Sequence, residues 1–337
     1  MIAFGTKKQL NFKRRALNLN FMALFLLIAI CSLAPRLQAS SSVASSSVAS
    51  PRPVVVVSVE PLALLVREIC DILCEVVTLV PRGISEHDWH PNPKEMAKAK
   101  NAVASIAVGL EFDNAWFVKI GTDSKSILWL GPILNPMTWW SDDLSGNVKH
   151  DRDEVGHKHK SKRDEADHKH GKLDPHFWVD ADRMAIAATA VAVHLSHVAP
   201  ASSEAFQGRG KAISSRLTSL QLVVESRRKT WNSRPVVMFH DVAGYFGRRF
   251  NLPILSVASG SAGHDLSARM IADMSKRFLS ANVAAVVVER DGGAAKNLAR
   301  ELKTSTKVID FAAAKNYVNW DAWYLQVVSS WEDVLKK

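Results

Sequence analysis

Short runs of β-branched residues alternate with helical patterns along most of this chain, and the alternation restricts its fold more than any other feature. The first run is PVVVVSV at 53–59, and runs of similar character recur in both halves of the chain. The later runs lie at 75–80, 103–109, 126–131, 235–239, 254–258, 283–289 and 307–310. Apolar runs of this length with helices between them predict parallel strands in an α/β layer.

One long helical pattern at 202–231 interrupts this alternation, although Gly208 and Gly210 weaken its first turns. A helix of that length extends over roughly 45 Å, which is enough to run from one domain to another. We therefore expect two similar lobes, each a small parallel sheet flanked by helices, joined by one long rigid helix with a binding cleft between the lobes. The expected boundaries are 53–199 for the N-terminal lobe, 200–231 for the connecting helix and 232–337 for the C-terminal lobe.

The first 39 residues are typical of a secretory signal peptide. They carry six basic residues and no acid, and their apolar segment at 21–33 is too short to span a bilayer comfortably. One candidate cleavage site follows Ala39, and a Ser-rich linker covers 40–52. Ile30 is too bulky for the position before a lipidated Cys31, so we do not expect a lipoprotein. We expect a periplasmic protein, with an uncleaved signal anchor as the alternative.

The net charge of the residues after position 39 is that of an ordinary soluble surface and gives little support to a nucleic acid as a partner. The formal net charge is +10, but the residues after 39 hold 37 basic and 33 acidic residues, a net charge of +4. If the signal is removed, the cysteines that remain are Cys70 and Cys74, four positions apart in a helical pattern. A disulfide and two buried thiols are both compatible with this spacing in an oxidising compartment.

Polar residues follow the predicted strands in both lobes. His87 comes after the run at 75–80, His240 after the run at 235–239, Asp310 ends the run at 307–310, and His176 lies in the tight segment DPHFWVD. Ligands of open parallel sheets bind beyond the carboxyl ends of the strands. Each residue alone is typical of a hydrogen-bonded structural group or a helix cap. Together, three imidazoles and one carboxylate predict a site for Zn²⁺, and less well for Mn²⁺.

A histidine-rich segment at 148–172 leads into DPHFWVD and has too few apolar residues to fold alone. We expect a disordered loop that captures zinc weakly, and a solvated linker is the alternative. Its histidines are His150, His157, His159, His168 and His170.

Three motifs resemble those of one protein family. EHDWHPNP at 86–93, DPHFWVD at 174–180 and FHDVAGYFGRRF at 239–250 are similar, in the same order, to segments of the zinc- and manganese-type (cluster A-I) substrate-binding proteins of bacterial ABC importers. The resemblance covers roughly residues 54–335 and is closest to the zinc-uptake members. It implies metal held between two lobes, and its ligand roles fall on His87, His176, His240 and Asp310.

The resemblance also implies a membrane permease as a partner, with a periplasmic metallochaperone as a second candidate. His240 favours zinc, because the manganese members use a glutamate there. The chain departs from the family pattern at Ala181, where proline is usual, and at His90, which replaces a polar residue. Whether His90 or Glu86 touches the metal stays open.

We therefore expect a periplasmic solute-binding protein that captures Zn²⁺ with high affinity and delivers it to an ABC permease, not an enzyme. A manganese-selective protein of the same type, a secreted zinc-buffering protein and a secreted zinc hydrolase are the alternatives. The hydrolase alternative lacks support, because the sequence has no HExxH motif and because four protein ligands would leave the zinc no open coordination position for water. Glu289 ends a predicted strand and is a candidate for its general base, but a carboxylate in the cleft is equally well a structural partner.

Overall fold

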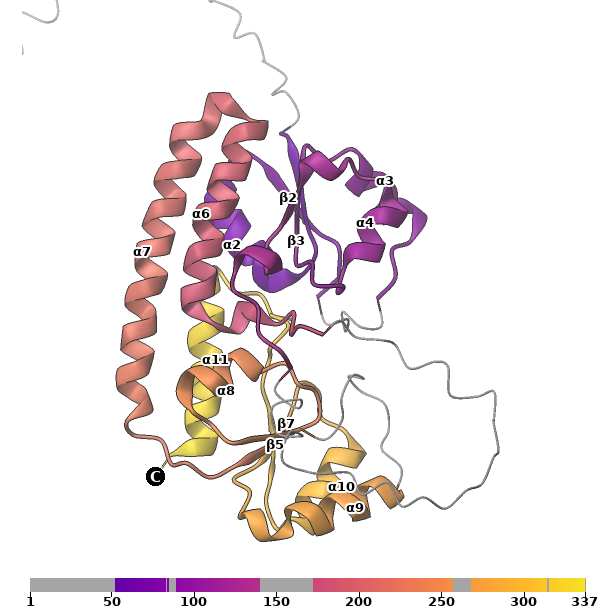
Figure 1. Cartoon of the computed structure of the whole chain (residues 1–337), viewed down its shortest axis with the longest axis vertical. Coiled ribbons are helices and arrows are strands. Elements are labelled where there is room, and N and C mark those ends of the chain that lie inside the picture. The colour runs from indigo at the N-terminus through magenta and orange to yellow at the C-terminus, as the bar shows by residue number, and fades with distance from the viewer. Residues whose placement is uncertain are drawn as a thin grey trace, which may run out of the picture. The chain divides into compact units, whose positions relative to one another are not determined.

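A computed structural model of the chain describes residues 52–82, 84, 89–139, 172–256, 268–313 and 315–336 (Figure 1). The predicted signal peptide and nearly all of the Ser-rich linker and the histidine-rich loop lie outside these ranges, as do Glu86 and His87. Among the residues that are described, no helix combines the length and the apolar character that crossing a membrane requires.

The N-terminal lobe contains a four-stranded parallel sheet with the strand order β2-β1-β3-β4. Its strands are β1 Val54–Val57, β2 Glu75–Thr78, β3 Ala104–Ala107 and β4 Ile127–Trp129. The two central strands are the most buried, as their continuous runs of small and β-branched residues predict. Each strand is shorter than its predicted run, because the residues at the run's ends leave the ladder and enter the connecting loops.

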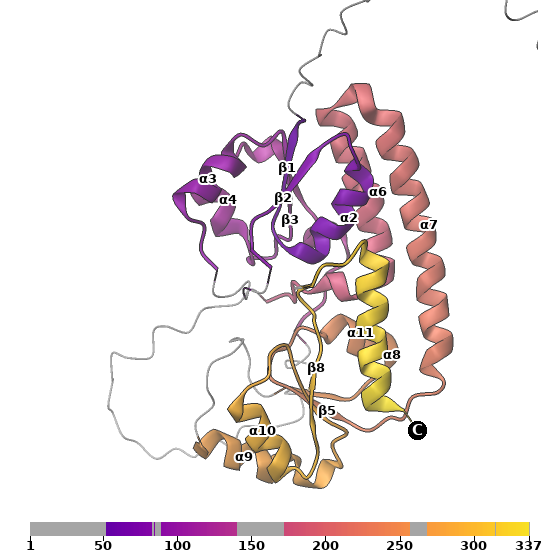
Figure 2. The same cartoon turned by 180° about the vertical axis from the view of Figure 1, so that it is seen from behind.

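Helices cover both faces of this sheet (Figure 1, Figure 2). Helix α2 (Glu60–Cys70) lies on one face, and α3 (Pro93–Lys100) and α4 (Asn114–Ile120) lie on the other. Helix α3 begins where the sequence indicates, since Asn92 and Glu95 form a reciprocal capping box at its first turn. Short 3-10 turns complete the lobe: η2 Ser124–Ser126, η3 Gly131–Ile133 and η4 Phe177–Val179.

The C-terminal lobe repeats the topology, with a four-stranded parallel sheet in the order β6-β5-β7-β8. Its strands are β5 Val236–Met238, β6 Ile254–Ser256, β7 Val286–Val288 and β8 Thr306–Val308. Its helical segments are α8 Gly244–Phe250, α9 Ala268–Phe278, η6 Leu279–Ala281, α10 Gly293–Glu301 and α11 Trp320–Leu335. The predicted pair of similar α/β lobes is therefore confirmed.

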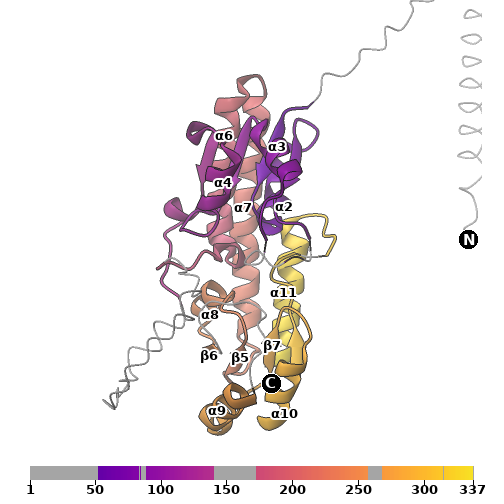
Figure 3. The same ribbon diagram turned by 90° about the vertical axis from the view of Figure 1, so that its right-hand side faces the viewer.

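Helix α7 (Ser203–Arg228) is the predicted connecting helix, and it contacts both α2 and α11. It packs antiparallel to α6 (Ala181–Val198), and the turn η5 (Pro200–Ser202) joins the two (Figure 1, Figure 3). The sequence predicted a helix to residue 231, but α7 ends at Arg228. Trp231 leaves the helix because it is buried and pairs with Lys336 in an isolated β-bridge.

A single arginine of α7 joins the two lobes. The guanidinium of Arg216 donates to Glu68 on α2 at 2.7 Å and to Asp321 on α11 at 2.7 Å. Arg216 is about two-fifths exposed, so each ion pair contributes little stability alone. The contact nevertheless fixes which turns of α2 and α11 face the connecting helix.

The two glycines near the start of α7 have different roles, although the sequence suggested that both weaken the helix. A Cβ added at Gly210 would lie 2.4 Å from the Cβ of Ala192 and 3.0 Å from the carbonyl oxygen of Ala188, both on α6. A Cβ added at Gly208 would meet nothing within 4 Å. Gly210 therefore permits the close approach of α6 and α7, and Gly208 is an exposed helix position with no packing function.

Alanine substitutions should separate these roles. We expect Gly210→Ala to lower the free energy of unfolding by about 1–3 kcal/mol, because the new methyl group forces the helices apart. Gly208→Ala, the matched control, should raise it by roughly 0.5–1 kcal/mol through helix propensity alone. Urea denaturation of both variants measures the difference, and equal gains in stability would contradict the close packing at Gly210.

Candidate metal site

His176 is held in one orientation by the carboxylate of Asp174. The backbone N–H of His176 donates to Oδ1 of Asp174 at 2.9 Å, and Nδ1 of its ring lies 2.9 Å from the same oxygen. Both residues are fully buried. Hydrogen on Nδ1 satisfies this contact, and Nε2 is then the ring nitrogen with a lone pair for a metal.

Burial raises the pKa of Asp174 to about 7, against the lowering effects of the hydrogen bond from His176 and of the charges on Arg248, His240 and Arg183. Near neutral pH this carboxyl group therefore lies close to the midpoint of its titration. A divalent cation in the same pocket would favour its ionised form, because opposite charges attract strongly in a buried site.

Aromatic rings surround His176. Its ring centroid lies 6.4 Å from that of Phe112, 5.5 Å from Trp139 and 5.1 Å from Trp178, all in edge-on geometry. Trp178 is fixed in turn, because its Nε1 donates to the carbonyl of Phe311 in the C-terminal lobe at 3.2 Å. These rings exclude water and leave the imidazole few alternative rotamers.

His240 reaches the same place from the other lobe. Its ring centroid lies 4.9 Å from that of His176, and its Nδ1 lies 3.0 Å from Oε2 of Glu289. Strand register explains the second contact. Met238 of β5 pairs with Val287 of β7, so two residues further along each strand His240 stands opposite Glu289.

Glu289 is ionised at neutral pH. Burial acts to raise its pKa, but the charge of His240 and the hydrogen bond to it hold the pKa below its usual value. An anionic partner that accepts the hydrogen on Nδ1 fixes the tautomer of His240. It also makes the lone pair of Nε2 a stronger ligand for a metal ion. The pairs His176–Asp174 and His240–Glu289 therefore share one arrangement, a carboxylate oxygen against Nδ1 of the histidine, with one histidine from each lobe.

Asp310 follows β8 in the same lobe as His240. Val288 of β7 pairs with Val308 of β8, so β7 lies between β5, which precedes His240, and β8, which precedes Asp310. The carboxylate of Asp310 accepts the backbone N–H of Lys315 at 3.3 Å. Within the described ranges, no three His, Cys, Asp or Glu residues form a group that could hold a metal ion.

Of the predicted ligands, His176 and His240 come together and Asp310 follows the end of β8. His87 lies outside the described residues, as do the five histidines of the loop at 148–172. His90 is described and exposed, next to the buried Trp89, which packs edge-on against Trp116 with ring centroids 4.8 Å apart.

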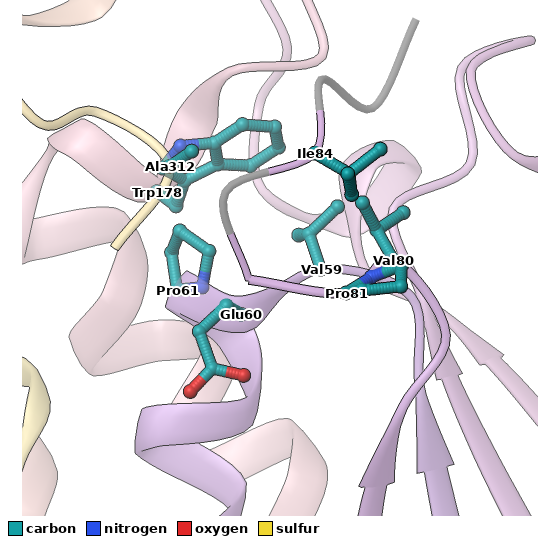
Figure 4. A pocket seen from close by; sticks show the side chains of 8 residues that line it. All are labelled: Val59, Glu60, Pro61, Val80, Pro81, Ile84, Trp178 and Ala312. Carbon is teal, nitrogen blue, oxygen red and sulfur yellow. The ribbon is translucent and has the colours of Figure 1, made fainter. Parts of the chain in front are cut away.

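A small pocket lies at the carboxyl ends of β1 and β2 (Figure 4). Its walls come mainly from the N-terminal lobe, with one residue from beyond β8. The lining residues are Val59, Glu60, Pro61, Val80, Pro81, Ile84, Trp178 and Ala312. The acid among them, Glu60, already accepts hydrogen bonds from Arg67 at 2.7 Å, Thr78 at 2.8 Å and Arg82 at 2.8 Å. The described lining therefore offers no ready metal donor.

The described residues on either side of 140–171 meet beside His176. Thr138 and Leu173 form an isolated antiparallel bridge, and the N–H of Asp174 donates to the carbonyl of Met137 at 2.8 Å. Tyr245 of the C-terminal lobe closes this junction, since its hydroxyl donates to the carbonyl of Asp174 at 2.9 Å and accepts from the N–H of Met137 at 3.1 Å.

The sequence indicated no role for Asp174 or Tyr245, and for Glu289 it left open a hydrolase base and a structural partner. For Asp174 the signal was present, because an aspartate two residues before a histidine across a proline can accept hydrogen bonds from the backbone N–H and the ring Nδ1–H of that histidine. For Glu289 there was no signal, because its contact depends on the register of two strands that are far apart in the sequence.

Comparisons with known proteins agree with this geometry. Residues 55–337 match the family described as "Zinc-uptake complex component A periplasmic". The high-affinity zinc uptake system protein ZnuA of Yersinia pestis is 24% identical over 206 residues, which are 59% of this chain and 63% of that protein. ZnuA of Bacillus subtilis is 23% identical over 290 residues, 86% of this chain and 85% of that protein.

Solved structures share the fold. A crystal structure of ZnuA superposes with a TM-score of 0.66 at 18% identity and covers 84% of this chain and 98% of its own. A zinc-bound ZnuA deletion mutant has a TM-score of 0.66 at 19% identity, covering 85% and 99%. A two-lobed fold with paired histidines between parallel sheets is that of a metal-binding component of an importer. The chain belongs to the periplasmic zinc-uptake component A family.

Glu289 should affect metal binding without being a ligand. We expect Glu289→Ala to weaken zinc binding by about 10- to 100-fold, because His240 loses the partner that fixes its tautomer, and Glu289→Gln to weaken it less. The control is Glu301→Ala, an exposed carboxylate at the end of α10. Calorimetric titration with Zn²⁺ measures the series, and an unchanged affinity in Glu289→Ala would contradict the assigned role.

Proposed function

We propose that this protein captures Zn²⁺ outside the cytoplasmic membrane and delivers it to the permease of an ABC importer. His87, His176, His240 and Asp310 are the proposed ligands. One observation carries the proposal: His176 and His240 come from different lobes, their rings lie 4.9 Å apart, and each has its Nδ1 against a carboxylate. Imidazoles oriented in this way are typical of zinc sites.

The other two proposed ligands follow strands of the two sheets. Asp310 follows β8, and its carboxylate accepts the N–H of Lys315. His87 lies two residues before the buried Trp89. We propose that both complete the coordination of zinc by His176 and His240, while α6 and α7 hold the lobes in place.

Zinc is proposed over manganese because of the donor chemistry. Nitrogen ligands suit Zn²⁺, whereas Mn²⁺ prefers sites dominated by oxygen. His240 is the discriminating residue, since a carboxylate there would leave two imidazoles instead of three. The names of the relatives agree with this choice, because ZnuA proteins of two bacteria are called high-affinity zinc uptake proteins.

The proposed role is binding and delivery and not catalysis. A closed four-ligand site leaves no position for an activated water, and the considered base, Glu289, is hydrogen-bonded to His240. Relatives in the comparison are metal-transport proteins. The proposed partner is the membrane permease, and a periplasmic metallochaperone is a second partner that could supply the metal.

Alanine substitutions test the ligand set. We expect His176→Ala and His240→Ala to weaken zinc binding by more than about 100-fold, beyond the effect of losing an outer carboxylate. His87→Ala and Asp310→Ala should also weaken it if their loops close on the metal. His197→Ala on the exposed side of α6 is the control. Calorimetry with Zn²⁺ and with Mn²⁺ measures all five variants, and unchanged zinc affinity in both His176→Ala and His240→Ala would exclude the site.

The histidine-rich loop should be separable from the tight site. We expect deletion of 148–172 to spare one tight zinc site and to remove the weak ones, because the junction between Thr138 and Leu173 is kept. A matched variant replaces His150, His157, His159, His168 and His170 with asparagine at constant length. Zinc stoichiometry by calorimetry reports both results. Loss of the tight site in either variant would show that the loop supplies a primary ligand.

A further inference from the structure

Cys70 and Cys74 lie together in the N-terminal lobe, away from the proposed metal site. Cys70 is the last residue of α2, and Cys74 immediately precedes β2. Both are thiols, both are buried in the same hydrophobic core, and they lie near enough for each to shift the pKa of the other. The spacing in the sequence left open whether these two side chains meet, and the fold brings them into contact.

A sharp reversal of the backbone produces this contact. Asp71 has φ 51° and ψ −122°, a conformation that a residue with a side chain rarely adopts, and the N–H of Leu73 donates to the carbonyl of Cys70 at 2.9 Å. The chain therefore turns back immediately after the helix, and Cys74 returns to the side of Cys70.

Arg209 of α7 holds this turn from outside. Its guanidinium donates to the carbonyls of Ile69 at 3.2 Å and Cys70 at 3.3 Å, and to the carboxylate of Asp71 at 2.8 Å. A cation at the carboxyl end of a helix satisfies carbonyls that have no partner within the helix. The two thiols are thus fixed by a contact with the connecting helix.

We propose that Cys70 and Cys74 form a disulfide that joins the end of α2 to the start of β2 once the chain has left the cytoplasm. This step rests on the proposed export to an oxidising compartment and is independent of zinc binding. The five-residue loop that it closes is small, and the turn at Asp71 already brings its ends together.

The two cysteines have different chemical roles in forming the bond. The hydrogen bond from Cys70 lowers the pKa of Cys74, burial opposes this, and the charges of Arg209 and Arg52 lower it further. The hydrogen bond with Cys74 and burial raise the pKa of Cys70. Cys74 is also the less buried of the two, so we assign it the attack on the donor and Cys70 the resolution of the mixed disulfide.

The oxidant is a disulfide-bonded donor, either a dithiol oxidoreductase or oxidised glutathione. The thiolate of Cys74 attacks one donor sulfur, forms a mixed disulfide and releases the other donor sulfur as a thiolate. Cys70 then loses its proton and attacks the Cys74 sulfur, which releases the second donor thiolate. Two cysteine thiols are oxidised, one donor disulfide is reduced to two thiols, and the protons pass to the donor or to solvent.

Peptide mapping tests the proposal directly. Cleavage by trypsin after Arg67 and after Arg82 places both cysteines in one peptide, 68–82, apart from Cys31. The full chain is purified from the exported fraction of a bacterial host, and a second sample is equilibrated with glutathione buffers from reducing to oxidising. Without reductant, we expect peptide 68–82 to resist iodoacetamide and to be two hydrogen atoms lighter than the dithiol. With reductant, it should take up two carbamidomethyl groups.

Thermal melting supplies a second measurement. The oxidised protein should melt roughly 5 °C above the reduced protein, and Cys70→Ala with Cys74→Ala should remove this dependence on the redox buffer. Comparison of the two wild-type states stays informative even if the variant fails to fold. Double alkylation at the oxidising end of the series, or glutathione attached to one cysteine alone, would overturn the proposal.

Zinc titration of the oxidised and reduced proteins separates this inference from the proposed function. Equal zinc affinity in the two states is the expected result, because the pair lies outside the site. Loss of affinity on reduction would overturn the independence of the pair. Absence of zinc binding in both states would contradict the proposed function and leave the disulfide intact.

Discussion

The buried carboxylate of Asp174 is the contact on which the arrangement of the site depends. It accepts hydrogen bonds from the backbone N–H and from the ring Nδ1 of His176. The backbone carbonyl of Asp174 also accepts the hydroxyl of Tyr245 from the opposite lobe. One residue thereby fixes the imidazole, joins the lobes and ends the segment that follows the histidine-rich loop. A buried carboxylate is costly to ionise unless its oxygens accept hydrogen bonds. Moving any one of these partners would therefore leave a buried charge or a buried hydrogen-bonding group unsatisfied.

The two lobes use the same topology to present different donors. In the C-terminal lobe, His240 and Glu289 follow neighbouring strands and meet through register. In the N-terminal lobe, the corresponding edge lines the small pocket, and the histidine that meets His240 comes from the turn before α6 instead. The shared fold supplies the carboxyl ends of two parallel sheets. Loops of different length then determine which side chains lie beyond those ends.

Most of the fold could be predicted from the sequence, because strand and helix periods are local. The paired residues His176 and His240 could also be predicted, since each follows a recognisable element. Two features could not. The contact between His240 and Glu289 depends on strand register, which no local pattern specifies. The role of Gly210 depends on the approach of α6, whereas the neighbouring Gly208 has the same sequence signal and no contact.

The junction between Thr138 and Leu173 has a kinetic consequence. Whatever path residues 140–171 follow, both of their ends start beside His176. A metal ion held anywhere on that segment is tethered to the tight site, and its effective concentration there is set by chain length and not by the zinc content of the surroundings. Transfer then becomes a unimolecular step whose rate does not depend on dilution. A scarce ion, once caught by the loop, would be presented to the site repeatedly before it could diffuse away.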